Sequence, residues 1–173
     1  RPGGRKDHGG EVPLTGGAAI LGAFVIVAVW FWGAQGVNPH LVVALGALLL
    51  MGTLDDRFHL AAPIRLGLQV LVAIFVVGIG GITISHLGTF PGTGKIELGW
   101  LEIPFTVLCL VGLINAINMA DGVDGLAGGM VAVMLSGLIV LAGMLGLWQW
   151  TLPVVGLLAA IIGFLFWNFP GFG

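Results

Sequence analysis

Six apolar stretches separated by short polar breaks constrain the fold of this chain more than any other feature. A membrane-spanning helix needs about 20 mainly apolar residues, because the hydrocarbon core of a bilayer is about 30 Å thick. The chain is 58% hydrophobic and only 8% charged, far from the composition of a soluble domain. We therefore expect an all-α, polytopic membrane helix bundle of one domain. Its predicted spans are approximately 14–34, 40–54, 64–82, 103–120, 127–147 and 151–168.

Glycine and cysteine usage agrees with a membrane bundle. The 31 glycines favour close contact between helices in lipid, where small residues let backbones approach. Cys109 is the only cysteine, so an internal disulfide is excluded, and its apolar neighbours indicate a packing residue. The net charge of −2 points to no particular partner, and no nucleic-acid partner is expected. Between the third and fourth spans, the glycines and the alternating Lys-Ile-Glu-Leu of 83–102 predict a small hairpin.

The charged residues predict an orientation for the six alternating spans. Of the six basic residues, only Lys95 falls on one side, and by the positive-inside rule the other side is cytoplasmic. Four acidic residues fall on that cytoplasmic side, and most tryptophans fall near the opposite interface. The four acids are Asp55, Asp56, Asp121 and Asp124.

Asp55 and Asp56 are adjacent carboxylates at the end of the second apolar stretch. Two such charges about 4 Å apart repel by about 4 kcal/mol at an effective dielectric constant near 20. A shared cation relieves this repulsion, and hard carboxylate oxygens suit Mg²⁺ or Mn²⁺, which also bind substrate phosphates. The alternative is a solvated helix end with no chemical role.

The segment NAINMADGVDGLAGG, residues 115–129, carries a second group of polar residues between two apolar stretches. The three-residue spacing of Asn115 and Asn118 places both amides on nearly one helix face, toward one cavity. Gly122 and Gly125 end this helix and permit left-handed backbone, so that amide N–H groups can turn toward a phosphate. The alternative is a hydrated turn in which an aspartate caps the next helix.

Four segments together resemble one known family, the polyprenyl-phosphate N-acetylhexosamine-1-phosphate transferases of the WecA/MraY/TagO superfamily. The segments are RKDHGGEVPLTGG at 5–17, GTLDDRFHL at 52–60, LGWLEIPFTVLCLVGLINAINMADGVDGLAGG at 98–129, and GFLFWNFP at 163–170. The first and third look closer to the WecA branch, which uses UDP-N-acetylglucosamine, than to the MraY branch.

The resemblance implies a Mg²⁺-dependent (or Mn²⁺-dependent) enzyme in the bacterial inner membrane, with its active site facing the cytoplasm. Such an enzyme transfers N-acetylhexosamine-1-phosphate, here GlcNAc-1-phosphate, from a UDP-sugar to undecaprenyl phosphate and releases UMP. Its product initiates cell-envelope polysaccharide synthesis. The partners implied are undecaprenyl phosphate, a UDP-N-acetylhexosamine and the lipid bilayer, and a homodimer remains open.

The resemblance also implies roles for the two acidic motifs. Asp55 and Asp56 act near the metal and the phosphates, one of them as a base toward the lipid phosphate. Asp121 and Asp124 shape the nucleotide-sugar site, and Asp121 is a third metal ligand.

The remaining site residues are expected to bind substrate. Asn115 and Asn118 bind it or orient the carboxylates, while Gly122 and Gly125 shape the turn. Arg5 and Lys6 either hold a phosphate or only set the topology, and His8 belongs to the same motif. Because the family continues past the NFP element into an acidic loop, a His-rich loop and more spans, we expect this chain to be a fragment.

Other classes of membrane protein fit the sequence less well. A transporter or ion channel would place acids near mid-membrane, whereas these lie at span ends. A CDP-alcohol phosphotransferase needs Asp-Gly followed by Ala-Arg, and Val123-Asp124-Gly125 breaks that motif. An intramembrane prenyltransferase needs a longer acidic spacing. A purely structural role leaves the four clustered acids without an explanation.

Overall fold

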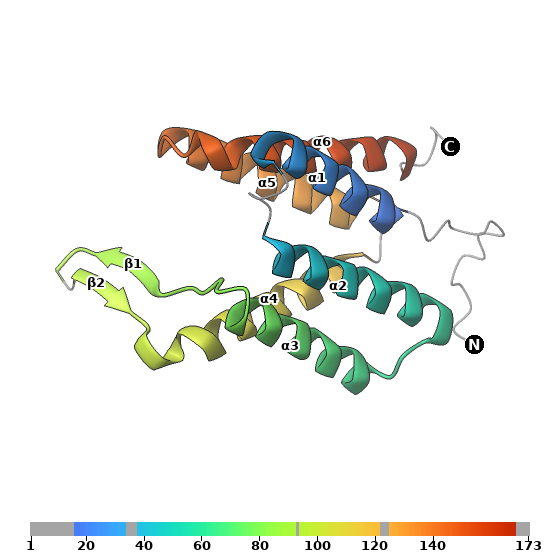
Figure 1. Cartoon of the computed structure of the whole chain (residues 1–173), viewed down its shortest axis with the longest axis horizontal. Coiled ribbons are helices and arrows are strands. Elements are labelled where there is room, and N and C mark those ends of the chain that lie inside the picture. The colour runs from blue at the N-terminus through green and yellow to red at the C-terminus, as the bar shows by residue number, and fades with distance from the viewer. Residues whose placement is uncertain (1–15, 34–37, 93, 122–124, 169–173) are drawn as a thin grey trace, which may run out of the picture.

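The computed structural model describes residues 16–33, 38–92, 94–121 and 125–168. Within these residues the chain forms a helical bundle with one β-hairpin at one end (Figure 1). The helices are α1 Gly16–Trp32, α2 Pro39–Phe58, α3 Ala62–Gly78, α4 Glu102–Ala120, α5 Leu126–Met144 and α6 Trp148–Asn168. The hairpin strands are β1 His86–Phe90 and β2 Gly94–Glu97, and a 3-10 turn at Gly99–Leu101 leads into α4.

Successive helices run in opposite directions, as expected for alternating spans. The turn between α2 and α3, the C-terminal end of α4 and the C-terminal end of α6 lie toward one end of the bundle (Figure 1). The hairpin lies beyond the other end. The ends of α2 and α4, which carry Asp55, Asp56 and Asp121, therefore share one end of the molecule, as the sequence predicts.

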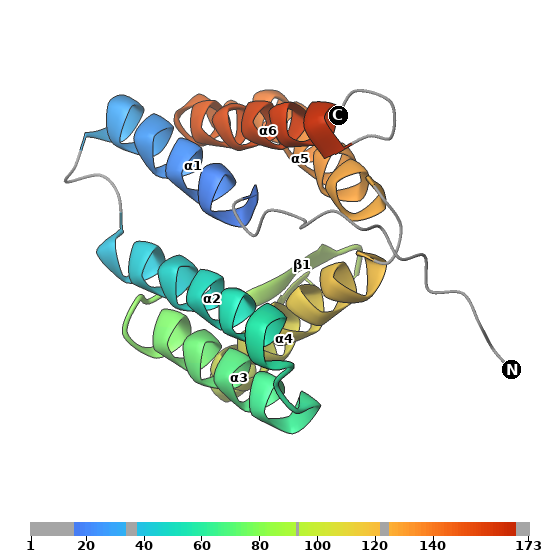
Figure 2. The same cartoon turned by 90° about the vertical axis from the view of Figure 1, so that its right-hand side faces the viewer.

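Two groups of three helices make up the bundle (Figure 2). α1 and α5 pack against α6 in one group, and α2 and α4 pack against α3 in the other. Contacts between the groups are much sparser than contacts within them. Because the chain passes from α4 in one group directly to α5 in the other, the segment that follows Asp121 joins the two groups.

Helix length and surface character identify a membrane protein. The helical segments Gly99–Ala120 and Leu126–Met144 have mean hydropathies of 1.9 and 2.2 and are long enough to cross a bilayer. Only 11% and 6% of the most apolar 18-residue part of each segment is buried, so these helices turn apolar side chains outward. A core helix of a soluble protein would bury that surface. With the shorter apolar segments Gly16–Phe31, Ala62–Gly78 and Thr151–Phe166, they form the all-α membrane bundle that the sequence predicts.

Glycines permit the close contacts between α6 and its neighbours. A Cβ atom on Gly128 of α5 would lie 2.7 Å from Leu165 Cδ2, and one on Gly16 of α1 would lie 2.7 Å from Phe164 Cε2. A Cβ atom on Gly156 would overlap Val27 of α1. The high glycine content is thus used partly for helix contact, as small residues are in other membrane bundles.

Polar side chains connect the elements at the hairpin end. Asn38 caps α2 by accepting from the His40 N–H at 2.9 Å, and its Nδ2 donates to the Gly80 carbonyl. The Thr106 hydroxyl accepts from the Ile84 N–H at 2.8 Å. The strands pair antiparallel, with an irregularity between His86 and Thr89, so the hairpin predicted for 83–102 is confirmed.

Candidate functional site

The first acidic pair lies inside the last turn of α2. The sequence placed the end of this span at residue 54, but the helix continues to Phe58. His59 then adopts a left-handed conformation with φ of 52°, and its N–H donates to the Asp55 carbonyl at 2.8 Å. Asp55 is half-buried and Asp56 is exposed. The pair therefore has a fixed helical backbone.

A short turn brings α3 back beside α2 and places a cation next to this pair. Ala61 precedes α3 in extended conformation, and Pro63 in the first turn suits a helix start because no intrahelical N–H bond is needed there. Arg65, less than one turn further, places Nη1 2.9 Å from Asp55 Oδ2. The sequence assigned Arg65 only to topology, but in the structure it contacts the first acidic motif.

Asn115 contacts a neighbouring helix. Its Nδ2 donates to Gln69 Oε1 of α3 at 2.6 Å and to the Val111 carbonyl of its own helix at 2.8 Å. Gln69 is only 1% exposed. We expected Asn115 and Asn118 to face one cavity, but only Asn118 lines the cavity described next. The α3 partner explains the difference, because a buried amide needs hydrogen bonds.

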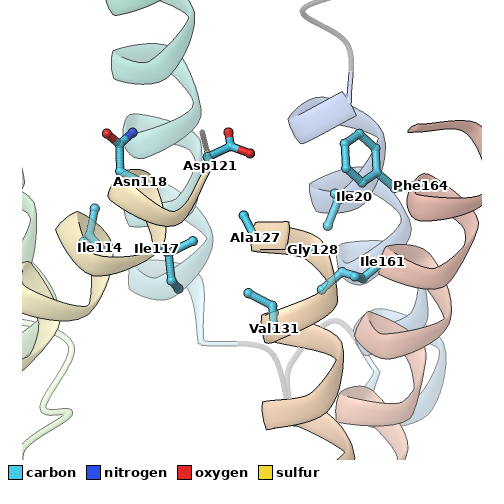
Figure 3. A pocket seen from close by; sticks show the side chains of 10 residues that line it. All are labelled: Ile20, Ile114, Ile117, Asn118, Asp121, Ala127, Gly128, Val131, Ile161 and Phe164. Carbon is cyan, nitrogen blue, oxygen red and sulfur yellow. The ribbon is translucent and has the colours of Figure 1, made fainter. Parts of the chain in front are cut away.

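A cavity of about 330 Å³ lies between the two helix groups at the end of α4 (Figure 3). Asn118 and Asp121 supply polar atoms on one side of it, and both are exposed. Its other lining residues are apolar or glycine: Ile20 of α1, Ile114 and Ile117 of α4, Ala127, Gly128 and Val131 of α5, and Ile161 and Phe164 of α6. The cavity thus combines apolar walls with one amide and one carboxylate.

Gly125, immediately before α5, has the left-handed backbone that a glycine permits. Gly125 has φ of 77°, a left-handed value, and its carbonyl accepts from the Gly129 N–H at 2.8 Å as α5 begins. A side chain would be strained at this φ. Gly122 and Asp124 lie outside the described residues, as do Arg5, Lys6 and His8.

The described aspartates are suitable ligands for a divalent cation, but they do not surround one metal-binding position. Asp55 and Asp56 lie in the last turn of α2, and Asp121 is the C-cap of α4. Carboxylates are disfavoured at helix C-termini, where the backbone dipole is already negative, so a cation would relieve both sites. Within the described residues, no three acidic, His or Cys side chains gather closely enough to hold a metal. The predicted metal site at Asp55, Asp56 and Asp121 stays a prediction.

This geometry fits magnesium better than a metal enclosed by the protein. Mg²⁺ commonly keeps waters and binds through one or two carboxylates plus substrate phosphates. One end of the bundle therefore carries exposed carboxylates, an amide and an apolar cavity.

Gln69 is the residue that the sequence analysis missed. It stands between Leu68 and Val70 in an apolar stretch, and an amide in that setting signals a buried hydrogen bond. Its partner, 46 residues away, could not be read from the sequence.

Comparison with known proteins identifies the family. A family model described as glycosyl transferase family 4 matches residues 38–171. A Bacillus subtilis (strain 168) protein named probable undecaprenyl-phosphate N-acetylglucosaminyl 1-phosphate transferase is 36% identical over 98% of this chain and 47% of its own length. Proteins of Yersinia pestis and Escherichia coli (strain K12), both named undecaprenyl-phosphate alpha-N-acetylglucosaminyl 1-phosphate transferase, are 33% and 32% identical over 97% of this chain and 46% of theirs.

No solved structure matches the chain. The chain spans about half the length of the curated relatives it matches. The family model covers well over half of the 173 residues, and the relatives align with almost all of them. The chain therefore belongs to glycosyl transferase family 4.

Proposed function

We propose that this protein transfers GlcNAc-1-phosphate from UDP-N-acetylglucosamine to undecaprenyl phosphate at the cytoplasmic face of the bacterial inner membrane. One observation carries the proposal. Asn118 and Asp121 line an apolar cavity at the bundle end that also carries Asp55 and Asp56. The names of the related proteins, which state this acceptor and this sugar, support the choice of substrates.

The reaction exchanges one phosphoanhydride bond for another. An oxygen of the lipid phosphate attacks the β-phosphorus of the UDP-sugar, and the bond from that phosphorus to the oxygen bridging it to the α-phosphate breaks. UMP leaves with that oxygen, and the new diphosphate joins the sugar to the lipid. Such transfers depend on in-line positioning and charge stabilisation more than on covalent chemistry by the protein.

The residues suit these tasks. Asn118 can donate hydrogen bonds to a phosphate or sugar oxygen from the cavity side. Asp56 is exposed in the last turn of α2, where it can hold a cation or accept a proton from the lipid phosphate. The apolar side chains of α1, α4, α5 and α6 around the cavity suit an isoprenoid chain.

A cation is part of the proposal because both substrates and the site are negatively charged. Carboxylates at the ends of α2 and α4 would repel phosphates unless a positive charge lay between them. Mg²⁺ or Mn²⁺, if held there, would supply that charge and would stabilise charge developing on the phosphoryl oxygens. Asp56 and Asp121 are the exposed described residues that would hold it.

The decisive experiment uses membranes that contain the protein at its full natural length. Undecaprenyl phosphate is added with radiolabelled UDP-GlcNAc, UDP-GalNAc or UDP-MurNAc-pentapeptide, and labelled lipid and released UMP are measured. We expect label in lipid with UDP-GlcNAc, equimolar UMP, and loss of both with EDTA. Label from another donor would change the sugar assignment, and no label from any donor would overturn the proposed function.

A further inference from the structure

One face of α3 contacts both helices that carry the described acids. Arg65 pairs with Asp55 near the end of α2, with 2.9 Å between Nη1 and Oδ2. Gln69 accepts a 2.6 Å hydrogen bond from Asn115 of α4. Because residues four apart in a helix lie on the same face, Arg65 and Gln69 form one polar stripe on α3. That stripe links the two acidic motifs through side chains that lie outside the cavity.

The Gln69–Asn115 contact has only one chemically consistent arrangement. Asn115 Nδ2 also lies 2.8 Å from the Val111 carbonyl, which can only accept, so this atom must be the amide nitrogen. Gln69 must therefore present its oxygen to Asn115. Gln69 is 1% exposed, and an amide withdrawn from water is disfavoured without such a partner.

The contact fixes how α4 is rotated about its own axis. The Val111 bond holds the Asn115 side chain against α4, and the Gln69 bond holds the same side chain against α3. Asn118 and Asp121 follow three and six residues later and line the cavity. Because Asn118 lies on the same helix and Asp121 is its C-cap, a rotation of α4 that broke the Gln69 contact would also turn both groups relative to the cavity.

We propose that Gln69 is a positioning residue for the transfer reaction. It holds α4 so that Asn118 and Asp121 face the cavity, while Arg65 on the same face of α3 holds Asp55. α3 thereby sets the spacing between the first acidic motif and the second. The claim that this spacing matters for catalysis rests on the proposed function. The mechanical link between α3 and α4 does not depend on it.

An exchange of the two amides tests the proposal. Asparagine is one methylene shorter than glutamine, so Gln69→Asn alone leaves a gap and Asn115→Gln alone overfills the contact. The double variant Gln69→Asn/Asn115→Gln restores the combined length. In the full-length protein we expect each single variant to lower kcat by about tenfold to a hundredfold, with KM for the UDP-sugar little changed. The double variant should recover most of the lost kcat.

The pattern of rescue separates positioning from other roles. If Asn115 acts on substrate directly, Asn115→Gln will stay impaired in the double variant, and the proposal is overturned. Gln69→Leu replaces the amide with an apolar side chain of similar size. If Gln69 only fills space, this variant will retain full kcat, and that result also overturns the proposal.

Hydrogen exchange measured by mass spectrometry tests the mechanical link without an activity assay. Gln69→Leu should accelerate exchange of the backbone amides of 115–121 and leave those of α5 unchanged. Ser136→Ala is a matched control, because the Ser136 hydroxyl donates only within its own helix, to the Ala132 carbonyl at 2.8 Å. Unchanged exchange at 115–121 in Gln69→Leu would refute the link. Faster exchange in a protein with no transferase activity would refute the proposed function alone.

Discussion

Arg65 neutralises Asp55, and its neighbour Asp56 is left exposed. The Nη1–Oδ2 distance is 2.9 Å, and the two side chains are 31% and 19% exposed. Within the described part of the chain, Asp56 takes part in no ion pair. The two adjacent carboxylates therefore occupy different environments, one bound to a guanidinium of the same chain and the other open to a ligand.

This asymmetry predicts different effects for the two aspartates. Asp55→Asn should lower the free energy of unfolding by less than about 1 kcal/mol, because the ion pair is partly exposed. Asp56→Asn should leave stability unchanged. Both substitutions should cut turnover by about 10²–10⁴-fold, the usual loss for a general base or metal–phosphate contact. Thermal unfolding in detergent and the labelled-lipid assay measure these effects, and near-normal turnover in both variants would remove the motif from the site.

Replacement of Arg65 tests its role directly. Arg65→Gln should lower turnover by about tenfold, because Asp55 loses the group that orients it. Arg57→Gln is the matched control: Arg57 lies at the same end of the bundle, in the last turn of α2, but its guanidinium lies over the Phe58 ring, 5.9 Å from the centroid. We expect the control to keep its turnover. Equal losses of turnover in both variants would show that turnover depends only on the positive charge at this end of the bundle.

Asp121 at the end of α4 should be as important as Asp56. Asp121→Asn keeps the size of the side chain but removes the charge at the cavity, so turnover should fall about 10²–10⁴-fold. Asn118→Asp makes the opposite change in charge. It adds a like charge beside the proposed phosphate site and should weaken UDP-sugar binding. KM and kcat for both variants distinguish these outcomes, and unchanged values for both would exclude the cavity as the substrate site.

Membrane orientation can be measured with single cysteines. In a Cys109→Ala background, Arg57→Cys should react with a membrane-impermeant maleimide only from the cytoplasmic side, and Lys95→Cys only from outside. Lys95 is preferred over Gly94 because Gly94 has φ of 74°, a value strained for a side chain. Reaction of both positions from the same side would contradict the alternation of the helices.

Gly156 tests the close contact between α1 and α6. Gly156→Ala should destabilise the protein by about 1–3 kcal/mol, because the new methyl group would overlap Val27. Gly137→Ala in α5 is the matched control, since its Cβ would meet nothing within 4 Å. The control should be neutral or stabilising by up to about 1 kcal/mol, because alanine favours a helix. Thermal unfolding in detergent measures both, and equal stabilities would mean that α1 and α6 are not in contact there.

The sequence by itself determined the class of the fold and which end of it carries the acids. Hydropathy and length are local properties, and a bilayer requires each apolar stretch to form its own helix. Alternation of those helices then brings Asp55 and Asp121 to the same end. The hairpin was predictable for the same reason, because Gly-rich turns and two-residue periodicity are local signals. The left-handed backbone of Gly125 could be anticipated because glycine permits it and the residue stands at a break between two apolar stretches.

Only the tertiary structure decided which helices touch and where each polar side chain points. α2 continues through Asp55 and Asp56, and α3 returns beside it so that Arg65 contacts Asp55. Asn115 turns to Gln69, although its spacing from Asn118 predicted a common cavity. Helical periodicity limits a side chain to a face of its own helix, but it does not say which helix will cover that face. That choice depends on packing between segments far apart in the chain, and here it assigned one amide to α3 and the other to the cavity.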